Sequence, residues 1–161
     1  MIFNLNQSNY EDNNGIKYND TNNRELTAAL LNNYFGEYNC SITICDRYSN
    51  DDLIVQYRDK TYHVDVKSCN IKSDTSMKIG YNLYQYDNTP ASEEKRIIMI
   101  YSDAICIYNI HQPNWIYNTF DLKVNDQAHG KMRKNMVQLN NNTPTVTIPY
   151  YVPQLNDYIP S

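Results

Sequence analysis

Glycine is scarce in this sequence, and that scarcity and two other absences exclude several classes of protein. Only 4 of the 161 residues are glycine, and neither GxGxxG nor GxxxxGK(S/T) occurs, so we expect no glycine-rich phosphate-binding loop. No apolar run approaches the roughly 18–20 residues that a membrane-spanning helix needs. Residues 1–7 have neither the basic start nor the long apolar stretch of a secretory signal, which predicts an intracellular, cytoplasmic protein with no membrane partner.

The four cysteines form no metal-binding motif. No two of them are spaced as CxxC, and no HxxxH accompanies them, which argues against a zinc site. Cys45 and Cys106 lie within apolar, strand-like runs. We therefore expect buried free thiols that act as small hydrophobic residues.

The sequence does contain enough apolar material for one core. Hydrophobic residues make up 41% and tyrosine occurs 16 times, so residues 1–161 are expected to form a single domain. The formal net charge is −4, but the charges are distributed unevenly. Residues 1–57 carry eight acidic and three basic side chains, whereas residues 58–78 carry three acidic and five basic ones. A nucleic-acid coat protein is typically basic throughout, whereas a nuclease needs only a local basic path.

Hydrophobic spacing predicts a helix near the start of the chain, followed by strands. Residues 22–36 carry apolar side chains at helical spacing, with Glu25 in the first turn and Gly36 as a favourable end. Residues 1–20 are polar and are expected to form a loosely ordered arm with a short strand at residues 2–5. Alternating polarity then predicts three strands in an antiparallel meander. These strands cover residues 41–46, 52–57 and 61–67.

The second half of the chain is less regular. Residues 79–86 suit a strand or a helix, and a short helix is expected to start at Pro90 because acidic residues follow the proline. A hairpin is predicted where two apolar runs flank a tight turn. Its strands cover residues 97–101 and 104–110. Residues 123–143 form a polar stretch in which no element is predicted, and residues 144–161 are expected to form an extended tail with a late strand at 145–148.

Acidic side chains stand at the ends of two neighbouring predicted strands. Asp52 opens one strand, and Asp65 and Lys67 lie near the end of the next. Because residues i and i+2 of a strand share a face, Asp65 and Lys67 are expected to project together while the flanking valines face the core. The hairpin connection would return Asp65 to the neighbourhood of Asp52. Two carboxylates beside one ammonium suit a divalent cation and the activation of a water for attack on a phosphodiester.

The order of these residues resembles the PD-(D/E)xK nuclease superfamily, and within it the archaeal-type Holliday junction resolvases and related small viral nucleases. In that family a helix carries a Glu, an Asp precedes an apolar strand, and D/E-x-K follows on the next strand. The matching residues in this sequence are Glu25, Asp52, Asp65 and Lys67. The proline that precedes the first Asp in the family is absent, so Asp51 and Asp52 are both candidates. The position directly before the apolar strand favours Asp52.

The resemblance implies a fold, an activity and roles for these residues. The fold is an α/β restriction-endonuclease-like one, with a central mixed β-sheet flanked by helices. The activity is divalent-metal-dependent hydrolysis of DNA phosphodiester bonds, with branched or recombination intermediates among the substrates. Asp52 and Asp65 would hold Mg²⁺ or Mn²⁺, Glu25 would bind the metal or its water, and Lys67 would orient the nucleophile. A homodimer is expected, because cleavage of a duplex or a junction requires two sites.

Basic and hydroxyl side chains that follow the acid pair are candidates for contacts with the phosphates of a nucleic acid. They are Ser68, Lys72, Lys78, Lys131, Arg133 and Lys134, with His129 close to the last three. His63 shares the predicted face of Asp65 and is a further candidate. For each residue alone the simpler interpretation is a solvated side chain, and for Asp65 and Lys67 it is a surface ion pair worth well under ~1 kcal/mol.

A second hypothesis from another class is open at this point. The chain could be a non-catalytic binding or anti-defence protein that retains a nuclease-like fold, with its acidic N-terminal third mimicking nucleic acid or docking on a basic partner. The abundance of asparagine, isoleucine and tyrosine is typical of an A+T-rich genome and suggests a viral protein, even a virion component. The sequence does not distinguish DNA from RNA, duplex from single-stranded or branched substrates, or endonuclease from exonuclease.

Overall fold

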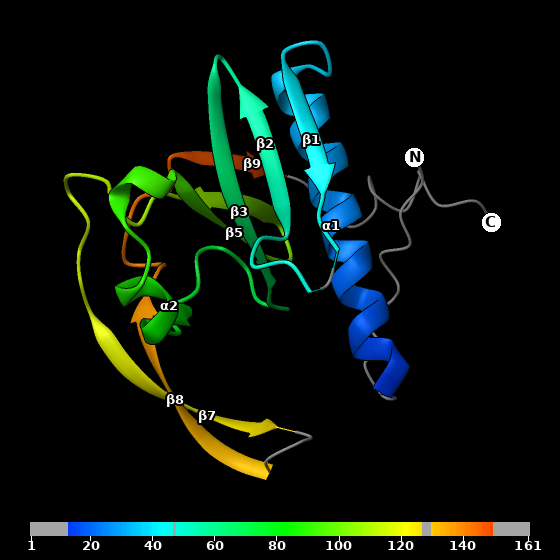
Figure 1. Ribbon diagram of the computed structural model, residues 1–161. Coiled ribbons are helices and arrows are strands. Elements are labelled where there is room, and N and C mark those ends of the chain that lie inside the picture. The colour runs from blue at the N-terminus through cyan, green and yellow to red at the C-terminus, as the bar shows by residue number, and fades with distance from the viewer. Residues whose placement is uncertain (1–12, 47, 127–129, 150–161) are drawn as a thin grey trace.

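The computed structural model consists of one long helix that lies against a curled sheet, and a second, smaller sheet (Figure 1). The structure describes residues 13–46, 48–126 and 130–149. Helix α1 spans Asn13–Phe35, and the main sheet has six described strands in the order β1-β2-β3-β5-β6-β9. Their bounds are Cys40–Ile44 (β1), Leu53–Tyr57 (β2), Lys60–Ser68 (β3), Lys95–Ile100 (β5), Ala104–Tyr108 (β6) and Val146–Pro149 (β9). Strands β3 and β5 pair in parallel and the other neighbours antiparallel, which makes the fold mixed α/β.

Helix α1 begins earlier than the sequence predicts. Its backbone is helical from Asn13, within the range expected to be a loosely ordered arm, whereas the strand expected at residues 2–5 lies outside the described residues. Leu26 and Leu31 are buried, as the helical spacing of the apolar residues predicts. The helix ends before Gly36, whose φ of +86° is a left-handed conformation that favours glycine.

The strands predicted from alternating polarity are confirmed. β1, β2 and β3 are consecutive antiparallel neighbours, with Leu53 opposite Val64. The predicted hairpin forms β5 and β6, which are buried along almost their whole length and therefore appear in the sequence as continuous apolar runs. The late strand forms β9 beside β6, and residues 150–161 of the expected tail lie outside the described residues.

Both faces of the main sheet are covered by apolar side chains. On the face toward α1, Leu31 packs with Val64 and Val66, so the two valines face the core as predicted. On the other face, Tyr81 packs on β5 and β6. Asp65 alternates with the valines and therefore faces this second cluster. Because that face is also covered, Asp65 is buried and does not lie on the surface.

The chain between the parallel strands β3 and β5 covers this second face. It contains β4 (Gly80–Asn82), the short helix α2 (Leu83–Asp87) and a 3₁₀ turn at Ala91–Glu93. Residues 79–86 suited either a strand or a helix, and this segment contains a strand followed by a helix. The change occurs at Asn82, whose side chain accepts a hydrogen bond of 3.1 Å from the backbone N–H of Gln85. The helical turn expected after Pro90 is present in the 3₁₀ form.

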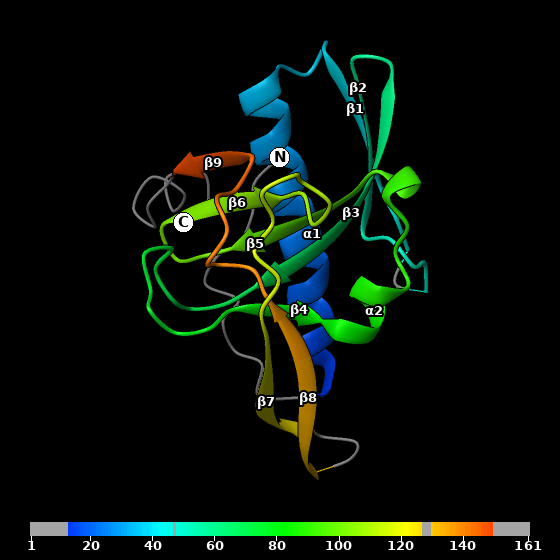
Figure 2. The ribbon, with the colours of Figure 1, turned by 90° about the vertical axis from the view of Figure 1, so that its left-hand side faces the viewer.

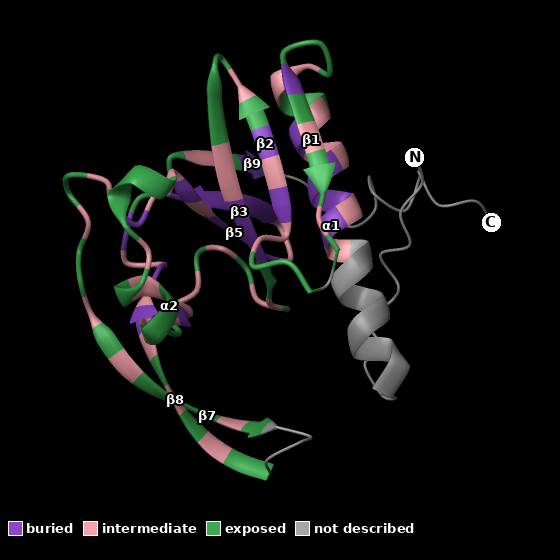
Figure 3. Cartoon of the chain, viewed as in Figure 1, coloured by how far each residue is buried: buried purple, intermediate pink, exposed green. Residues whose placement is uncertain are grey.

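Much of the polar stretch 123–143, in which the sequence predicts no element, belongs to a long hairpin. β7 (Thr119–Asp126) and β8 (Gly130–Gln138) pair antiparallel, and β4 joins β8 at the base to give a second sheet in the order β4-β8-β7. We call this hairpin the β7–β8 ribbon. It projects away from the main sheet, and exposed and half-buried positions alternate along it (Figures 2 and 3). Lys123, Asn125, Lys131, Arg133 and Asn135 are among the exposed residues, but Leu122 is exposed and Lys134 half-buried, so polarity does not show a two-residue period in the sequence.

The prediction of free thiols is confirmed. Cys40 and Cys106 are buried, whereas Cys45 lies just beyond the end of β1 and is only half-buried. Burial raises the pKa of the Cys106 thiol, which is typical of a structural cysteine of low reactivity. No helix in the described part of the chain combines the length and the apolar content that a membrane crossing requires.

Candidate functional site

The two predicted acids and the lysine meet where β2 begins beside β3. The backbone N–H of Asp52 donates to the Val64 carbonyl at 2.9 Å, and one oxygen of its carboxylate, Oδ2, accepts the Val66 backbone N–H at 2.7 Å. These bonds fix the Asp52 side chain against β3. Lys67 Nζ lies 3.6 Å from Asp65 Oδ1, and the Asp52 carboxyl is within hydrogen-bond reach of Asp65. The structure therefore brings Asp52, Asp65 and Lys67 together.

The Asp65 carboxyl has an unusually high pKa for an aspartate. Only 6% of the residue is exposed, and this burial raises its pKa to about 6, with the neighbouring Asp52 also raising it and Lys67 lowering it. The Tyr81 hydroxyl lies against Asp65, and burial together with this carboxyl raises the pKa of Tyr81. A desolvated carboxyl beside a second one favours binding of either a proton or a cation.

Arg24 of α1 holds Asp52 from the opposite side. Its guanidinium Nη2 lies 2.9 Å from Asp52 Oδ1, and Nη1 donates to the Cys45 carbonyl at 2.8 Å. The arginine side chain is 8% exposed and that of Asp52 16%, so both charges are largely removed from water. Arg24 therefore joins the helix to the start of β2, and each Asp52 oxygen already accepts one hydrogen bond.

Asp51 faces a different set of partners. Lys95 Nζ lies 2.9 Å from Asp51 Oδ1, and His63 Nδ1 lies 2.7 Å from Asp51 Oδ2. Burial alone would raise the pKa of Asp51, but the hydrogen bonds and charges of Lys95 and His63 outweigh it and lower the pKa. Of the two adjacent aspartates left open by the sequence, Asp52 is the one that meets Asp65.

We call these seven residues the acid–base cluster. They are Arg24, Asp51, Asp52, His63, Asp65, Lys67 and Lys95. Arg24 and Lys95 have no counterpart in the sequence prediction, because they come from α1 and β5 and meet the aspartates only through tertiary packing. A lysine that opens an apolar strand is the one signal that points to Lys95, which is 6% exposed.

Glu25, predicted from the resemblance to contribute to the metal site, does not join the cluster. It is half-buried on α1 and makes no hydrogen bond or ion pair with any described residue. Successive helix residues point about 100° apart, and it is the preceding Arg24 that reaches the aspartates. Across the described ranges, no group of three or more His, Cys, Asp or Glu side chains is arranged to hold a metal ion.

The candidate phosphate-binding residues are divided between two places. Ser68 ends β3, next to the cluster, and its Oγ accepts a hydrogen bond of 3.0 Å from Asn23 Nδ2. Lys72 is exposed on the connection that follows, and Lys78 Nζ lies 5.8 Å from the centre of the Phe120 ring at the base of the β7–β8 ribbon. The remaining candidates are on the ribbon itself. Lys131 and Arg133 are exposed, Lys134 is half-buried, and His129 lies outside the described residues.

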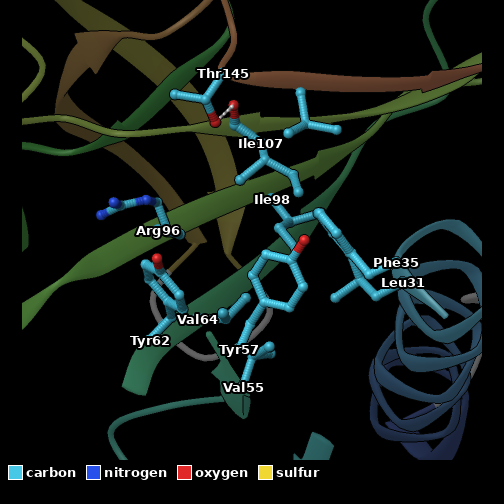
Figure 4. A pocket seen from close by; sticks show the side chains of 11 residues that line it. Leu31, Phe35, Val55, Tyr57, Tyr62, Val64, Arg96, Ile98, Ile107 and Thr145 are labelled. Atoms are coloured by element: carbon cyan, nitrogen blue, oxygen red, sulfur yellow. Dashed lines mark hydrogen bonds between the residues drawn. The ribbon is translucent and has the colours of Figure 1, made fainter. Parts of the chain in front are cut away.

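A cavity on the opposite face of the main sheet has a different character. Its volume is about 260 Å³, and α1 contributes Leu31 and Phe35 while the sheet contributes residues such as Val64 and Ile98 (Figure 4). Among the described residues, Arg96 is the one charged side chain in its lining, and it lies 5.0 Å from the Tyr62 ring and 3.3 Å from Glu94. Its described lining contains no carboxylate and none of the seven residues of the acid–base cluster.

No protein-family model, curated protein or solved structure matches this chain.

Proposed function

We propose that this protein is a divalent-metal-dependent nuclease of the PD-(D/E)xK type that hydrolyses DNA phosphodiester bonds. The observation that carries the proposal is the meeting of the Asp52 and Asp65 carboxyls beside the Lys67 ammonium. The order of elements supports it, since a helix with Glu25 precedes an antiparallel meander in a mixed sheet. We propose a restriction-endonuclease-like fold on the same grounds.

The donor set suits a small, hard cation. Mg²⁺ commonly keeps several of its waters and is held by one or two protein carboxylates together with substrate phosphates, so Asp52 and Asp65 would suffice to hold Mg²⁺ or Mn²⁺ here. Burial and the neighbouring Asp52 disfavour the ionised form of Asp65, and a cation bound beside it would stabilise that form. When bound, such an ion polarises the phosphoryl oxygen and lowers the pKa of a coordinated water.

The residues of the chain itself would prepare the site for this chemistry. Arg24 and the Val66 N–H fix both oxygens of Asp52, which keeps the carboxylate in one orientation. Tyr81 covers Asp65 and keeps water away from it. Lys67 is 44% exposed at its side chain, so its ammonium is able to approach an incoming phosphate or orient the attacking water while it remains near Asp65.

The test is cleavage of labelled duplex, single-stranded and branched DNA in the presence of Mg²⁺ or Mn²⁺. Lys67→Ala should lower the rate by about 10²-fold or more, because a positioned lysine is lost from the reacting phosphate. Lys60→Ala is the matched control, since Lys60 lies on the same strand and pairs only with Glu94 at 3.8 Å. Equal rates for Lys67→Ala and the wild type would refute this role.

We also propose that the protein is a homodimer, and sedimentation of the full chain tests this.

A second candidate function is favoured by one observation. Arg24 already neutralises Asp52 at 2.9 Å, and a structural ion pair of this kind needs no metal, as in a non-catalytic nuclease-fold binding or anti-defence protein. Calorimetric titration with Mn²⁺ separates the two candidates. Heat of binding that disappears in Asp65→Asn supports the nuclease, whereas absence of both Mn²⁺ binding and cleavage of any nucleic acid supports the binding protein.

A further inference from the structure

The β7–β8 ribbon carries its cations on one face. In the register of the hairpin, Lys123 lies opposite Arg133 and Asn125 lies opposite Lys131, so Lys123, Lys131 and Arg133 share a face. All three are exposed and line a common hollow. Lys134 points to the other face, which bears the half-buried Phe120, Val124, Met132 and Met136.

These cations are not explained by the stability of the ribbon. Like charges directly opposite each other on a hairpin are destabilising, and Lys123 faces Arg133 in that way. None of the three pairs with an acid in the described part of the chain, and the one described acid on the same face, Asp121, makes no ion pair with them. A surface that keeps unfavourable positive charge together is suited to an anionic partner.

The base of the cationic face is linked to the acid–base cluster through Tyr81. By strand alternation, Arg133 and Lys131 lie on the same face of β8 as Val137, which is buried and pairs with Tyr81 of β4. Tyr81 in turn lies against Asp65. In both views of the ribbon diagram the ribbon extends from the side of the molecule at which β3 ends (Figures 1 and 2).

We propose that the β7–β8 ribbon is an arm that binds the phosphates of double-stranded DNA by lying in its major groove. That groove is wide enough for a two-stranded ribbon, whereas the major groove of A-form RNA is too narrow and deep. Single strands are typically bound by exposed aromatic rings, but the cationic face has none, and Phe120 lies on the other face. The inference deepens the proposed function, on which it rests for the cleavage step, because it names duplex DNA as the substrate delivered to Asp52 and Asp65.

Binding is tested without cleavage, by fluorescence anisotropy of an end-labelled DNA duplex in EDTA over a range of salt concentrations. Two lost phosphate contacts in Lys131→Gln/Arg133→Gln should weaken binding on the order of 60-fold at about 0.1 M salt and lower the salt slope by about 1.8. The matched control is Arg58→Gln/Lys60→Gln, which removes two exposed cations from the β2–β3 turn at the far end of the sheet. The control should bind as the wild type does. Circular dichroism checks that both variants are folded.

Three results would overturn the inference: unchanged duplex binding in the ribbon variant, an equal loss in the control, or tighter binding of single-stranded DNA or duplex RNA than of duplex DNA. The proposed function fails separately. If the wild type binds duplex DNA through the ribbon but cleaves no DNA with Mn²⁺, the inference about the ribbon is supported and the proposed nuclease activity is refuted. If the wild type cleaves DNA with a divalent metal and the ribbon variant binds duplex DNA unchanged, the proposed nuclease activity is supported and the inference about the ribbon is refuted.

Discussion

The acid–base cluster and the β7–β8 ribbon differ in whether their charged side chains are paired. In the cluster each aspartate has a cationic partner, with Arg24 on Asp52, Lys95 on Asp51, and Lys67 near Asp65. On the ribbon, Lys123, Lys131 and Arg133 stand together without an acidic partner among the described residues. Arg24, Asp65 and Lys95 of the cluster are buried, whereas the three ribbon cations are exposed.

The difference shows what burial demands of a charged group. A charge removed from water must be paired and hydrogen-bonded, and loss of one partner leaves the other uncompensated. An exposed charge is screened by water and salt, so an unpaired cation costs little. Substitutions in the cluster should therefore change stability strongly, whereas substitutions of the ribbon cations should change binding and leave stability almost unaltered.

The largest effect is expected from Arg24→Met. The substitution leaves the Asp52 carboxylate without its buried partner and should lower the free energy of unfolding by about 3–5 kcal/mol, measured by urea denaturation. Lys60→Ala, which removes the exposed pair with Glu94, should cost less than about 1 kcal/mol in the same assay. Similar losses in the two variants would abolish the contrast between buried and exposed charge.

The next effect is a dependence on pH. Because the pKa of Asp65 is raised to about 6, the folded state holds this proton more tightly than the unfolded state, whose Asp pKa is about 3.9. The group contributes stability that is complete below about pH 4 and is lost as the pH rises through 6. Asp65→Asn cannot titrate, so it should gain up to about 3 kcal/mol relative to the wild type between about pH 4 and pH 7.

The stability of Asp51→Asn relative to the wild type should change with pH in the direction opposite to that of Asp65→Asn. The pKa of Asp51 is lowered by Lys95 and His63 against the effect of burial, so its carboxylate contributes stability that is present above the unfolded pKa and is lost as the pH falls. The Asn variant should therefore lose stability relative to the wild type as the pH rises. Urea denaturation at a series of pH values measures both variants, and parallel pH profiles for the two would contradict the assignment.

A smaller effect is expected where the ribbon joins the body. A Cβ added at Gly80 would lie 2.8 Å from Met136 Cβ and 2.8 Å from Phe120 Cζ, so Gly80→Ala should cost about 1–3 kcal/mol by overpacking. Gly130 at the end of the ribbon has open space around it but a φ of +73°, and Gly130→Ala should cost about 1 kcal/mol of backbone strain. Thermal unfolding ranks the two, and a greater loss at Gly130 would argue against the close packing at Gly80.

The smallest effect is expected on the ribbon surface. Arg133→Glu places an acid opposite Lys123 and should stabilise the protein by about 0.2–1 kcal/mol while it weakens DNA binding. Asn135→Glu places an acid opposite Asp121 and should destabilise by a similar amount. Chemical denaturation of both variants checks the signs. Destabilisation by Arg133→Glu would mean that the arginine has a structural role on the ribbon.

The main sheet was largely predictable because its signals are local. The alternation in residues 41–67 and the paired apolar runs of β5 and β6 identify strands that form with near neighbours in sequence. The ribbon was not predictable in the same way. Its described half-buried positions are Phe120, Val124, Met132, Lys134, Met136 and Gln138, a set too sparse and too mixed to show a clear period among lysines and asparagines.

The sequence predicted only the part of the site that lies within one hairpin, β2 and β3. The convergence of Asp52 with Asp65 and Lys67 follows from the two-residue period and the turn between the strands. The partners Arg24 and Lys95 come from a helix and from a parallel strand, whose placement no local pattern specifies. The expectation for Glu25 depended on the resemblance alone, and the helix directs its neighbour to the cluster instead.

The parallel pairing of β3 with β5 has a consequence for the order in which the chain folds during synthesis. Strands β1 to β3 follow one another closely in the sequence and are able to pair as soon as they leave the ribosome. Asp51 acquires Lys95 only after residues 69–94 have emerged and closed a long loop, which costs chain entropy. In a nascent chain that stops before β5, Asp51 would therefore lack Lys95, and this part of the cluster would form only when β5 joins the sheet.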